Sequence, residues 1–293
     1  MTYLLHLFIL VGIYAILSMS LNLISGYTGL LSIAHAGFYG IGAYVAALMA
    51  LHAHTNFLLN IACGIVAAGL LSLVVAVPSL RLRGDYFVIA TFAFQIIAFS
   101  IMNNWVSVTA GPFGLPGIPR PEILGFTFVT HIHFLVLVGA FAVLALFFLN
   151  RIVHSPYGRV LRAIREDEVF TQSLGKNVTY FKISVFVTGA AIASIGGALY
   201  AHYITFIDPT SFTINESIFI LAIVIIGGSG NLVGSIVGAL VLVMVPEFFR
   251  FIGMPSAIAA NMRQIFYGGL LVLFMMFMPE GFLGEYTFKK GER

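Results

Sequence analysis

The chain has 293 residues, of which 60% are hydrophobic and only 9% are charged, and its mean hydropathy is +1.04. A soluble domain carries roughly 25% charged residues, so this composition excludes an ordinary globular enzyme and also a disordered chain. No Asp, Glu, Lys or Arg occurs from Met1 to Leu80. A bilayer accepts such a segment, whereas a soluble fold could not cover its surface with it. We therefore expect a polytopic integral membrane protein.

Several apolar stretches are long enough for a membrane helix of ~20 residues: about 3–24, 29–51, 57–80, 86–106, 131–150, 178–203 and 264–280. The stretch 216–249 is also apolar, but glycines interrupt it at 227–231. It either crosses the membrane twice or forms a re-entrant pair, and both return the chain to the same side. The sequence predicts a single all-α transmembrane domain over residues 1–293, with about eight to nine membrane segments that include this glycine-broken pair.

The basic residues predict the orientation of these segments. Most of the 14 Lys and Arg residues fall within 81–83, 151–182 and 289–293, and the number of crossings puts these three segments on one side. The positive-inside rule makes that side cytoplasmic and places the N-terminus outside. The opposite side holds Arg120, Arg250 and Arg263.

Two loops differ from the rest of the chain. The first, about 108–125, is expected on the outer side, and four of the ten prolines fall between 111 and 121. That stretch is predicted to be non-helical and semi-rigid because proline fixes φ. The second, about 151–177, is expected on the inner side and is the only charged insertion of any size.

The inner loop carries helix start and stop signals. Ser155-Pro156 is an N-cap followed by proline at the first helical position, and Gly175 is a suitable stop. Val160, Leu161 and Ile164 share one helical face. That stripe fails past Glu168, which predicts a bend near 167–168 and two short helices. A capped amphipathic helix suits a docking element, although a solvated connector is the alternative.

Five sequence motifs, in the same order along the chain as in the family, resemble those of the LivM-type permease subunits of bacterial branched-chain amino acid ABC importers. They are Ser25–Phe38 (SGYTGLLSIAHAGF), Arg81–Phe87 (RLRGDYF), Gly114–Pro119 (GLPGIP), Ser155–Glu168 (SPYGRVLRAIREDE) with Gly175, and Ile226–Gly234 (IGGSGNLVG). Together they span nearly the whole chain. The resemblance implies a permease of the bacterial inner membrane that passes branched-chain or related hydrophobic amino acids into the cytoplasm.

The resemblance also implies partners and a coupling site. The partners are a homologous second permease, two cytoplasmic ATPase subunits and an extracytoplasmic solute-binding protein. The inner loop would be the coupling helix that docks on an ATPase, and the 111–121 loop would face the binding protein. The residues implied in coupling to the ATPase are Ser155, Pro156, Gly158, Arg159, Arg162, Arg165, Glu166, Asp167, Glu168 and Gly175.

The residues themselves point to a chain that does not power itself. There is no Walker A pattern, and the ionisable groups Asp85, Asp208, Glu216, Glu247, Arg250 and Arg263 all fall at predicted span ends. His35 and His202 are the exceptions. A proton-coupled carrier places such groups at mid-membrane. No catalytic constellation, metal site or cofactor site is evident in the sequence.

Glycine-broken segments are the candidates for the translocation path. Gly26–Leu31 and Gly227–Leu232 share the pattern G-x-[S/T]-G-x-L, and such paired interruptions mark discontinuous helices in transporters. Ser32 and His35, three residues apart, are expected on one helical face. The candidate path residues are Ser32, His35, Gln95, Gly228, Ser229 and Asn231. For Ser32, His35 and Gln95 the alternative role is interhelical hydrogen bonding, and for the paired glycine motif the alternative is chance similarity of a short, glycine-rich pattern.

Two other functions stay open at this point. Related ABC permeases serve urea, short amides, other amino acids or sugars. A self-sufficient channel or ion-coupled carrier, with 151–177 as a mere connector, belongs to a different class.

Overall fold

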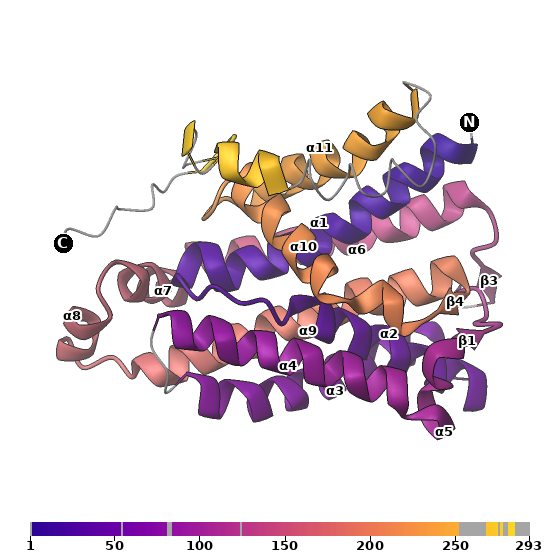
Figure 1. Cartoon of the computed structure of the whole chain (residues 1–293), viewed down its shortest axis with the longest axis horizontal. Coiled ribbons are helices and arrows are strands. Elements are labelled where there is room, and N and C mark those ends of the chain that lie inside the picture. Colours follow the sequence, from indigo (N-terminus) through magenta and orange to yellow (C-terminus); the bar gives the residue numbers. More distant parts are fainter. Residues whose placement is uncertain are drawn as a thin grey trace.

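Helices dominate the computed structural model, which describes residues 2–53, 55–80, 84–123, 125–251, 268–274, 276–277 and 281–284. The longer helices, which run side by side in Figure 1, are α1 (Thr2–Thr28), α2 (His35–His52), α3 (Phe57–Ser79), α4 (Asp85–Asn104), α6 (His131–His154) and α9 (Val178–Ile204). The other helical elements are α5 (Val106–Thr109), η1 (Gly111–Phe113), α7 (Pro156–Glu166), α8 (Glu168–Ser173), η2 (Pro209–Phe212), α10 (Ile214–Gly227) and α11 (Leu232–Phe251). Four two-residue strands are β1 (Leu115–Pro116), β2 (Glu122–Ile123), β3 (Phe126–Thr127) and β4 (Phe206–Ile207).

Five helices within the described residues are long and apolar enough to cross a membrane, namely α1, α3, α4, α6 and α9, and α10 with α11 forms a sixth, bent candidate. The prediction of an all-α polytopic fold is confirmed, whereas the predicted number of eight to nine membrane segments is not. The predicted span 29–51 is shorter as a helix, because α2 begins only at His35. The predicted span 264–280 lies partly outside the described residues. Six of the basic residues used to predict the orientation lie outside them altogether, namely Arg81, Arg83, Arg263, Lys289, Lys290 and Arg293.

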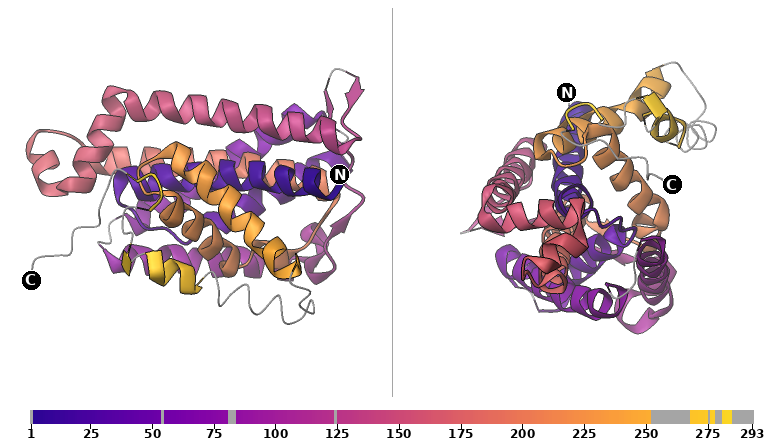
Figure 2. Two further views of the ribbon diagram at one scale, coloured as in Figure 1. Left: turned by 90° about the horizontal axis from the view of Figure 1, so that it is seen from above. Right: turned by 90° about the vertical axis from the view of Figure 1, so that its left-hand side faces the viewer.

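The core forms around α1, which contacts α6, α9, α10 and α11, and the end-on view in Figure 2 shows the other helices grouped about it. Helices α2 and α9 pack backbone against backbone. A Cβ on Gly42 would lie 2.3 Å from the carbonyl oxygen of Ser194, and one on Gly197 would lie 2.0 Å from that of Tyr39. Small residues allow this close approach, which drives helix association where lipid removes the hydrophobic advantage of burial.

The α10–α11 pair bends by 119° at a break of four residues. Helix α10 has 14 residues and is therefore ~21 Å long, which is short of the ~30 Å hydrocarbon core. A bend of more than 90° also turns α11 back against the direction of α10. The chain therefore returns toward the side from which α10 came, as both alternatives predicted for 216–249 require.

The two distinctive loops lie at opposite ends of the bundle (Figure 1). In the predicted outer loop, β1 pairs with β4, and β2 pairs with β3. The start of α1 lies at the same end, because His6 Nδ1 is 2.7 Å from the Tyr203 hydroxyl and Arg120 lies over the Tyr203 ring.

The prediction that 111–121 is entirely non-helical is wrong at Gly111–Phe113, which forms the 3-10 turn η1. Pro112 is tolerated there because the first turn of a helix needs no N–H from it.

Candidate functional site

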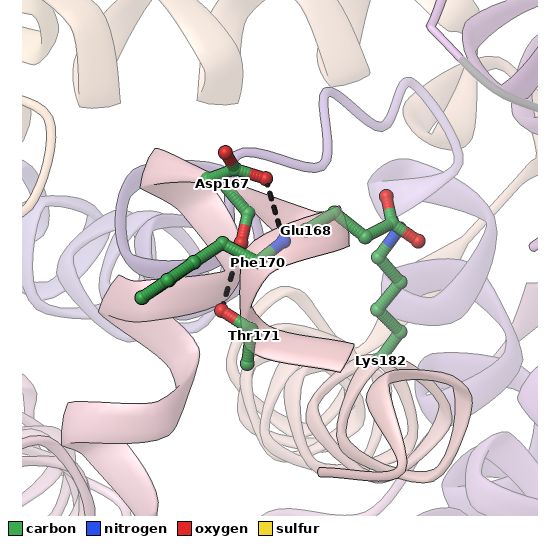
Figure 3. A network of polar contacts seen from close by, with 5 residues as sticks. All are labelled: Asp167, Glu168, Phe170, Thr171 and Lys182. Atoms are coloured by element: carbon green, nitrogen blue, oxygen red, sulfur yellow. Dashed lines mark hydrogen bonds and ion pairs between the residues drawn. The ribbon is translucent and has the colours of Figure 1, made fainter. Parts of the chain in front are cut away.

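The inner loop folds as an elbow of two short helices, which we define as residues 155–175. The Ser155 hydroxyl accepts a hydrogen bond from the Gly158 N–H, and Pro156 occupies the first turn of α7. Asp167 ends α7, and its carboxylate accepts from the Phe170 N–H at 2.9 Å to start α8 (Figure 3). Gly175 then turns the chain with φ +77°. The predicted bend near Asp167 and Glu168 is therefore confirmed. The sequence could predict it because each signal is a local capping interaction.

One face of the elbow packs onto the bundle. Leu161 and Ile164 are buried, as their shared helical face predicts, and Val160 is half-buried. The Tyr157 hydroxyl lies 2.5 Å from the Ser184 Oγ of α9, and burial raises the pKa of the Tyr157 phenol above its ordinary value.

An ion pair fastens α8 to α9. Lys182 Nζ lies 2.6 Å from Glu168 Oε2, and Figure 3 shows the two side chains reaching toward each other. The Lys182 side chain is only 10% exposed, whereas that of Glu168 is 41% exposed. The elbow is therefore held to the transmembrane body at both of its helices.

Other side chains of the elbow are exposed, and they include apolar residues as well as charged ones. Val169, Phe170 and Leu174 are 61–63% exposed, and Arg159, Glu166 and Asp167 are exposed with them. Exposed apolar residues that gather on one element mark an interaction surface. The three apolar residues could not be recognised from the sequence because they do not continue the apolar stripe of α7, and their exposure follows only from the bend at Asp167.

Two arginines of the predicted coupling set turn back toward the protein. Arg162 donates from Nη2 to the carbonyl oxygen of Val153 at 3.3 Å. Arg165, whose side chain is 11% exposed, donates from Nη1 to the carbonyl oxygen of Gly26 at the end of α1. Their guanidinium groups thus make contacts within this chain.

The two glycine-broken segments meet in space. Asn22 of α1 accepts from the Gly230 N–H at 2.9 Å and donates to the carbonyl oxygens of Gly228 at 3.2 Å and Asn231 at 2.8 Å. Asn231 in turn caps α11, because its side-chain oxygen accepts from the backbone N–H groups at 233 and 234. Ser229 is buried beside them. Asn22 could not be found from the sequence, because its side-chain hydrogen bonds reach residues more than 200 positions away.

A second polar cluster surrounds the start of α2. The Gln95 side chain accepts from the Gly37 N–H at 2.6 Å and donates to the Phe212 carbonyl at 2.8 Å. The Ser217 hydroxyl accepts from the Ala36 N–H at 2.9 Å, and His35 Nε2 lies 2.7 Å from the Ser20 Oγ. The candidate path residues therefore fall into two clusters, one at the start of α2 and one at the α10–α11 break.

The prediction that Ser32 and His35 share one helical face is wrong. Residues 29–34 are not helical, and Gly29 has φ +75°. Ser32 instead turns the chain before α2, where its hydroxyl accepts from the Ala34 N–H at 3.3 Å.

Glu216 is deeper than the sequence indicates. It lies in the first turn of α10, as predicted, but its carboxylate accepts a hydrogen bond from Tyr14, a residue near the middle of α1. The start of α10 is therefore at mid-bundle depth, because β4 and η2 lead the chain inward first. His202, in contrast, lies at the outer loop, where its Nδ1 is 2.8 Å from the Pro119 carbonyl oxygen.

Comparison with known proteins bears on this arrangement. The family described as "Branched-chain amino acid transport system / permease component" matches residues 3–275. The chain belongs to this permease family. It is 35% identical over 92% of its length to the high-affinity branched-chain amino acid transport system permease protein LivM of Salmonella typhimurium and, at the same identity and coverage, to that of Escherichia coli, covering 68% of each relative. No solved structure matches.

A second type of permease is also similar to the chain. The permease protein LivH of Escherichia coli is 28% identical over 93% of this chain and 91% of the relative. The chain is thus similar to two kinds of permease protein, LivM and LivH, both named for a high-affinity branched-chain amino acid transport system. In this member of the family, the described residues contain no group of three or more His, Cys, Asp or Glu side chains placed to hold a metal ion.

Proposed function

We propose that the chain is the transmembrane permease subunit of an ATP-driven ABC importer that moves branched-chain amino acids into the cytoplasm across the bacterial inner membrane. Membership of the permease family and 35% identity to two LivM proteins support this substrate class. The similarity to LivH supports a heterodimer of two homologous permeases. ATP hydrolysis then falls to two separate cytoplasmic ATPase subunits.

The exposed face of the elbow is the observation that carries the coupling assignment. A mere connector needs neither caps at both helices nor an ion pair to the body, and it would not expose three apolar residues to the cytosol. We assign Val169, Phe170 and Leu174, together with the charged Arg159 and Glu166, to the groove of an ATPase subunit. A rigid element docked at this face would pass the closing motion of the ATPases to α6 and α9, which flank it in the chain.

The opposite end of the bundle is proposed to receive the solute-binding protein. There β1 and β4 tie the proline-rich loop to the segment after α9, and the Pro119 carbonyl is held by His202. Phe113 is 84% exposed at this end. A loop held in this way gives the binding protein a fixed surface to dock on.

The two polar clusters are proposed to line the path, with Ser32, His35 and Gln95 in one and Gly228, Ser229 and Asn231 in the other. Helix α2 begins within the bundle, so the positive end of its dipole suits a substrate carboxylate, while the broken backbone near Gly228 offers carbonyl groups to an ammonium group. Contacts with neutral groups of this kind let a substrate pass rather than hold it tightly.

A charge introduced on the elbow tests the proposal. We expect Phe170→Asp to lose the co-purifying ATPase subunits and ATP-driven leucine uptake in proteoliposomes, because a carboxylate does not enter an apolar groove without cost. Phe113→Asp is the matched control, since it places the same change on an exposed phenylalanine at the other end of the bundle, and it should retain the ATPase subunits. Retention of both the subunits and uptake by Phe170→Asp would refute the coupling assignment.

One observation favours a second candidate, an ion-coupled carrier. Glu216 places a carboxylate at the depth of Tyr14, where such carriers hold their proton-binding groups. Gradient-driven transport by this chain alone in proteoliposomes would establish that candidate, whereas strict dependence on ATP and the partner subunits would eliminate it. Among ABC importers, uptake of urea or a sugar in place of leucine would change only the cargo.

A further inference from the structure

Arg165 differs from its neighbours on α7 in where its side chain goes. Arg159, less than two turns earlier, is exposed, whereas the Arg165 side chain is 11% exposed and lies against the bundle. Burying a guanidinium group requires compensating contacts, since an unpaired charge loses its hydration. The contacts that Arg165 makes are therefore informative.

Arg165 Nη2 lies 3.8 Å from the carboxylate of Glu166 on the same helix, and further contacts of Arg165 lie on the two glycine-broken segments. Its Nη1 donates to the carbonyl oxygen of Gly26, in the last turn of α1, where carbonyl groups lack helical partners and favour a cation. A Cβ on Gly29 would lie 3.0 Å from its Cγ, and a Cβ on Gly230 would lie 3.1 Å from its Nη1. The side chain thus lies against Gly26, Gly29 and Gly230.

The two segments also touch each other directly. A Cβ on Gly26 would lie 2.5 Å from the backbone nitrogen of Gly230, and Asn22 bonds that same nitrogen. The end of α1 and the α10–α11 break therefore meet at the cytoplasmic end of the proposed path. Arg165 reaches this contact from α7, the helix assigned to the moving elbow.

We infer that Arg165 is the latch of a cytoplasmic gate formed where Gly26–Gly29 meets Gly228–Asn231. With the elbow at rest, the guanidinium holds the two glycine-broken segments together and the path is closed. Displacement of α7 by the ATPase subunits withdraws the guanidinium from the Gly26 carbonyl and lets the segments part. This inference rests on the proposed function, and it gives Arg165 a task within the membrane body rather than at the ATPase surface.

Substrate leak without ATP tests the latch. The experiment uses proteoliposomes with the complete importer, loaded with radiolabelled leucine and free of ATP. Arg165→Met keeps an unbranched apolar stem but removes the guanidinium with its charge and donors, and we expect about a tenfold faster efflux, which is the size of effect that a lost hydrogen bond to a charged group produces. Arg151→Met, the same change at an exposed arginine in the last turn of α6, should leave efflux at the wild-type rate.

The outcomes separate the latch from the proposed function. ATP-driven leucine uptake by the unaltered importer is measured in the same preparation, and its absence counts against the proposed function. Normal uptake together with wild-type efflux in Arg165→Met overturns the latch alone. A purely structural role for Arg165 predicts reduced uptake and assembly without leak, which also overturns it.

A second measurement needs no variant and covers the case in which Arg165→Met does not assemble. In the unaltered complex, hydrogen exchange of the amides at 26–31 and 228–231 is compared before and after ATPase closure is trapped with a non-hydrolysable ATP analogue. We expect both segments to exchange faster together on closure. Unchanged exchange in a complex that is competent for ATP hydrolysis would overturn the latch.

Discussion

The ion pair between Glu168 and Lys182 predicts an asymmetric response to mutation. Removing one partner of a fully buried pair costs ~3–5 kcal/mol because the other charge stays buried, whereas an exposed pair contributes ~0–1 kcal/mol. Lys182 is 10% exposed and Glu168 is 41% exposed, so the two partners lie between these limits. Glu168→Ala leaves a buried ammonium group, for which we expect a loss of about 2 kcal/mol in the free energy that attaches α8. Lys182→Met leaves a half-exposed carboxylate, and we expect about 1 kcal/mol or less.

Hydrogen exchange measures this free energy locally. Amides of Glu168–Ser173 should exchange about 30-fold faster in Glu168→Ala, since each 1.4 kcal/mol is a factor of ten. The double variant Glu168→Ala with Lys182→Met should exchange more slowly than Glu168→Ala alone, because no charge then remains buried. Equal effects of the two single changes, or a double variant less protected than Glu168→Ala, would refute the reasoning from burial.

Three further predictions concern other parts of the protein. Gly158→Ala should destabilise the elbow by about 1–3 kcal/mol, because its Cβ would lie 2.1 Å from the Val153 carbonyl oxygen; thermal unfolding of the purified permease measures this, and Gly139→Ala, where nothing lies within 4 Å, is the neutral control. Asn22→Leu keeps the volume but removes the bonds to the α10–α11 break, so we expect lower thermal stability and slower uptake, and unchanged values for both would contradict the role given to Asn22. Glu216→Gln preserves an acceptor for Tyr14 but cannot carry a proton. We expect this variant to retain ATP-driven uptake in proteoliposomes that hold no ion gradient. Loss of uptake in the variant, together with inhibition of the unaltered protein by a protonophore, would point to the ion-coupled carrier.

The sequence predicted the elbow in detail because its signals are local. Ser155, Pro156, Asp167 and Gly175 each act on residues within four positions of themselves, and capping preferences hold irrespective of the rest of the fold. The apolar composition likewise predicted the class of fold without any knowledge of how the segments pack. Whether other helices cover the outward side of α8 depends on distant parts of the chain, so the exposure of Phe170 could not be predicted.

Depth in the membrane and contacts between distant segments could not be predicted. Hydropathy shows that Glu216 is near the start of an apolar helix, but it does not show at what depth in the membrane that helix begins. The sequence therefore predicted Glu216 at the membrane surface. The paired glycine motifs indicated interruptions at Gly26–Leu31 and Gly227–Leu232 without indicating that these meet. Asn22 joins them, and a lone asparagine in an apolar run carries no signal for its partner.

The contact between the glycine-broken segments bears on how the protein obtains energy for transport. A chain that gains energy from its own ionisable groups needs them to face the path and to exchange protons with both sides, whereas Glu216 is engaged by Tyr14. The contact between Gly26 and Gly230, in contrast, is reached from α7 through Arg165, and α7 leads into α8, whose exposed side is proposed to dock on an ATPase subunit. In that proposal, work applied to α8 has a mechanical route one side chain long to the contact between the glycine-broken segments, as an importer driven by a separate ATPase requires.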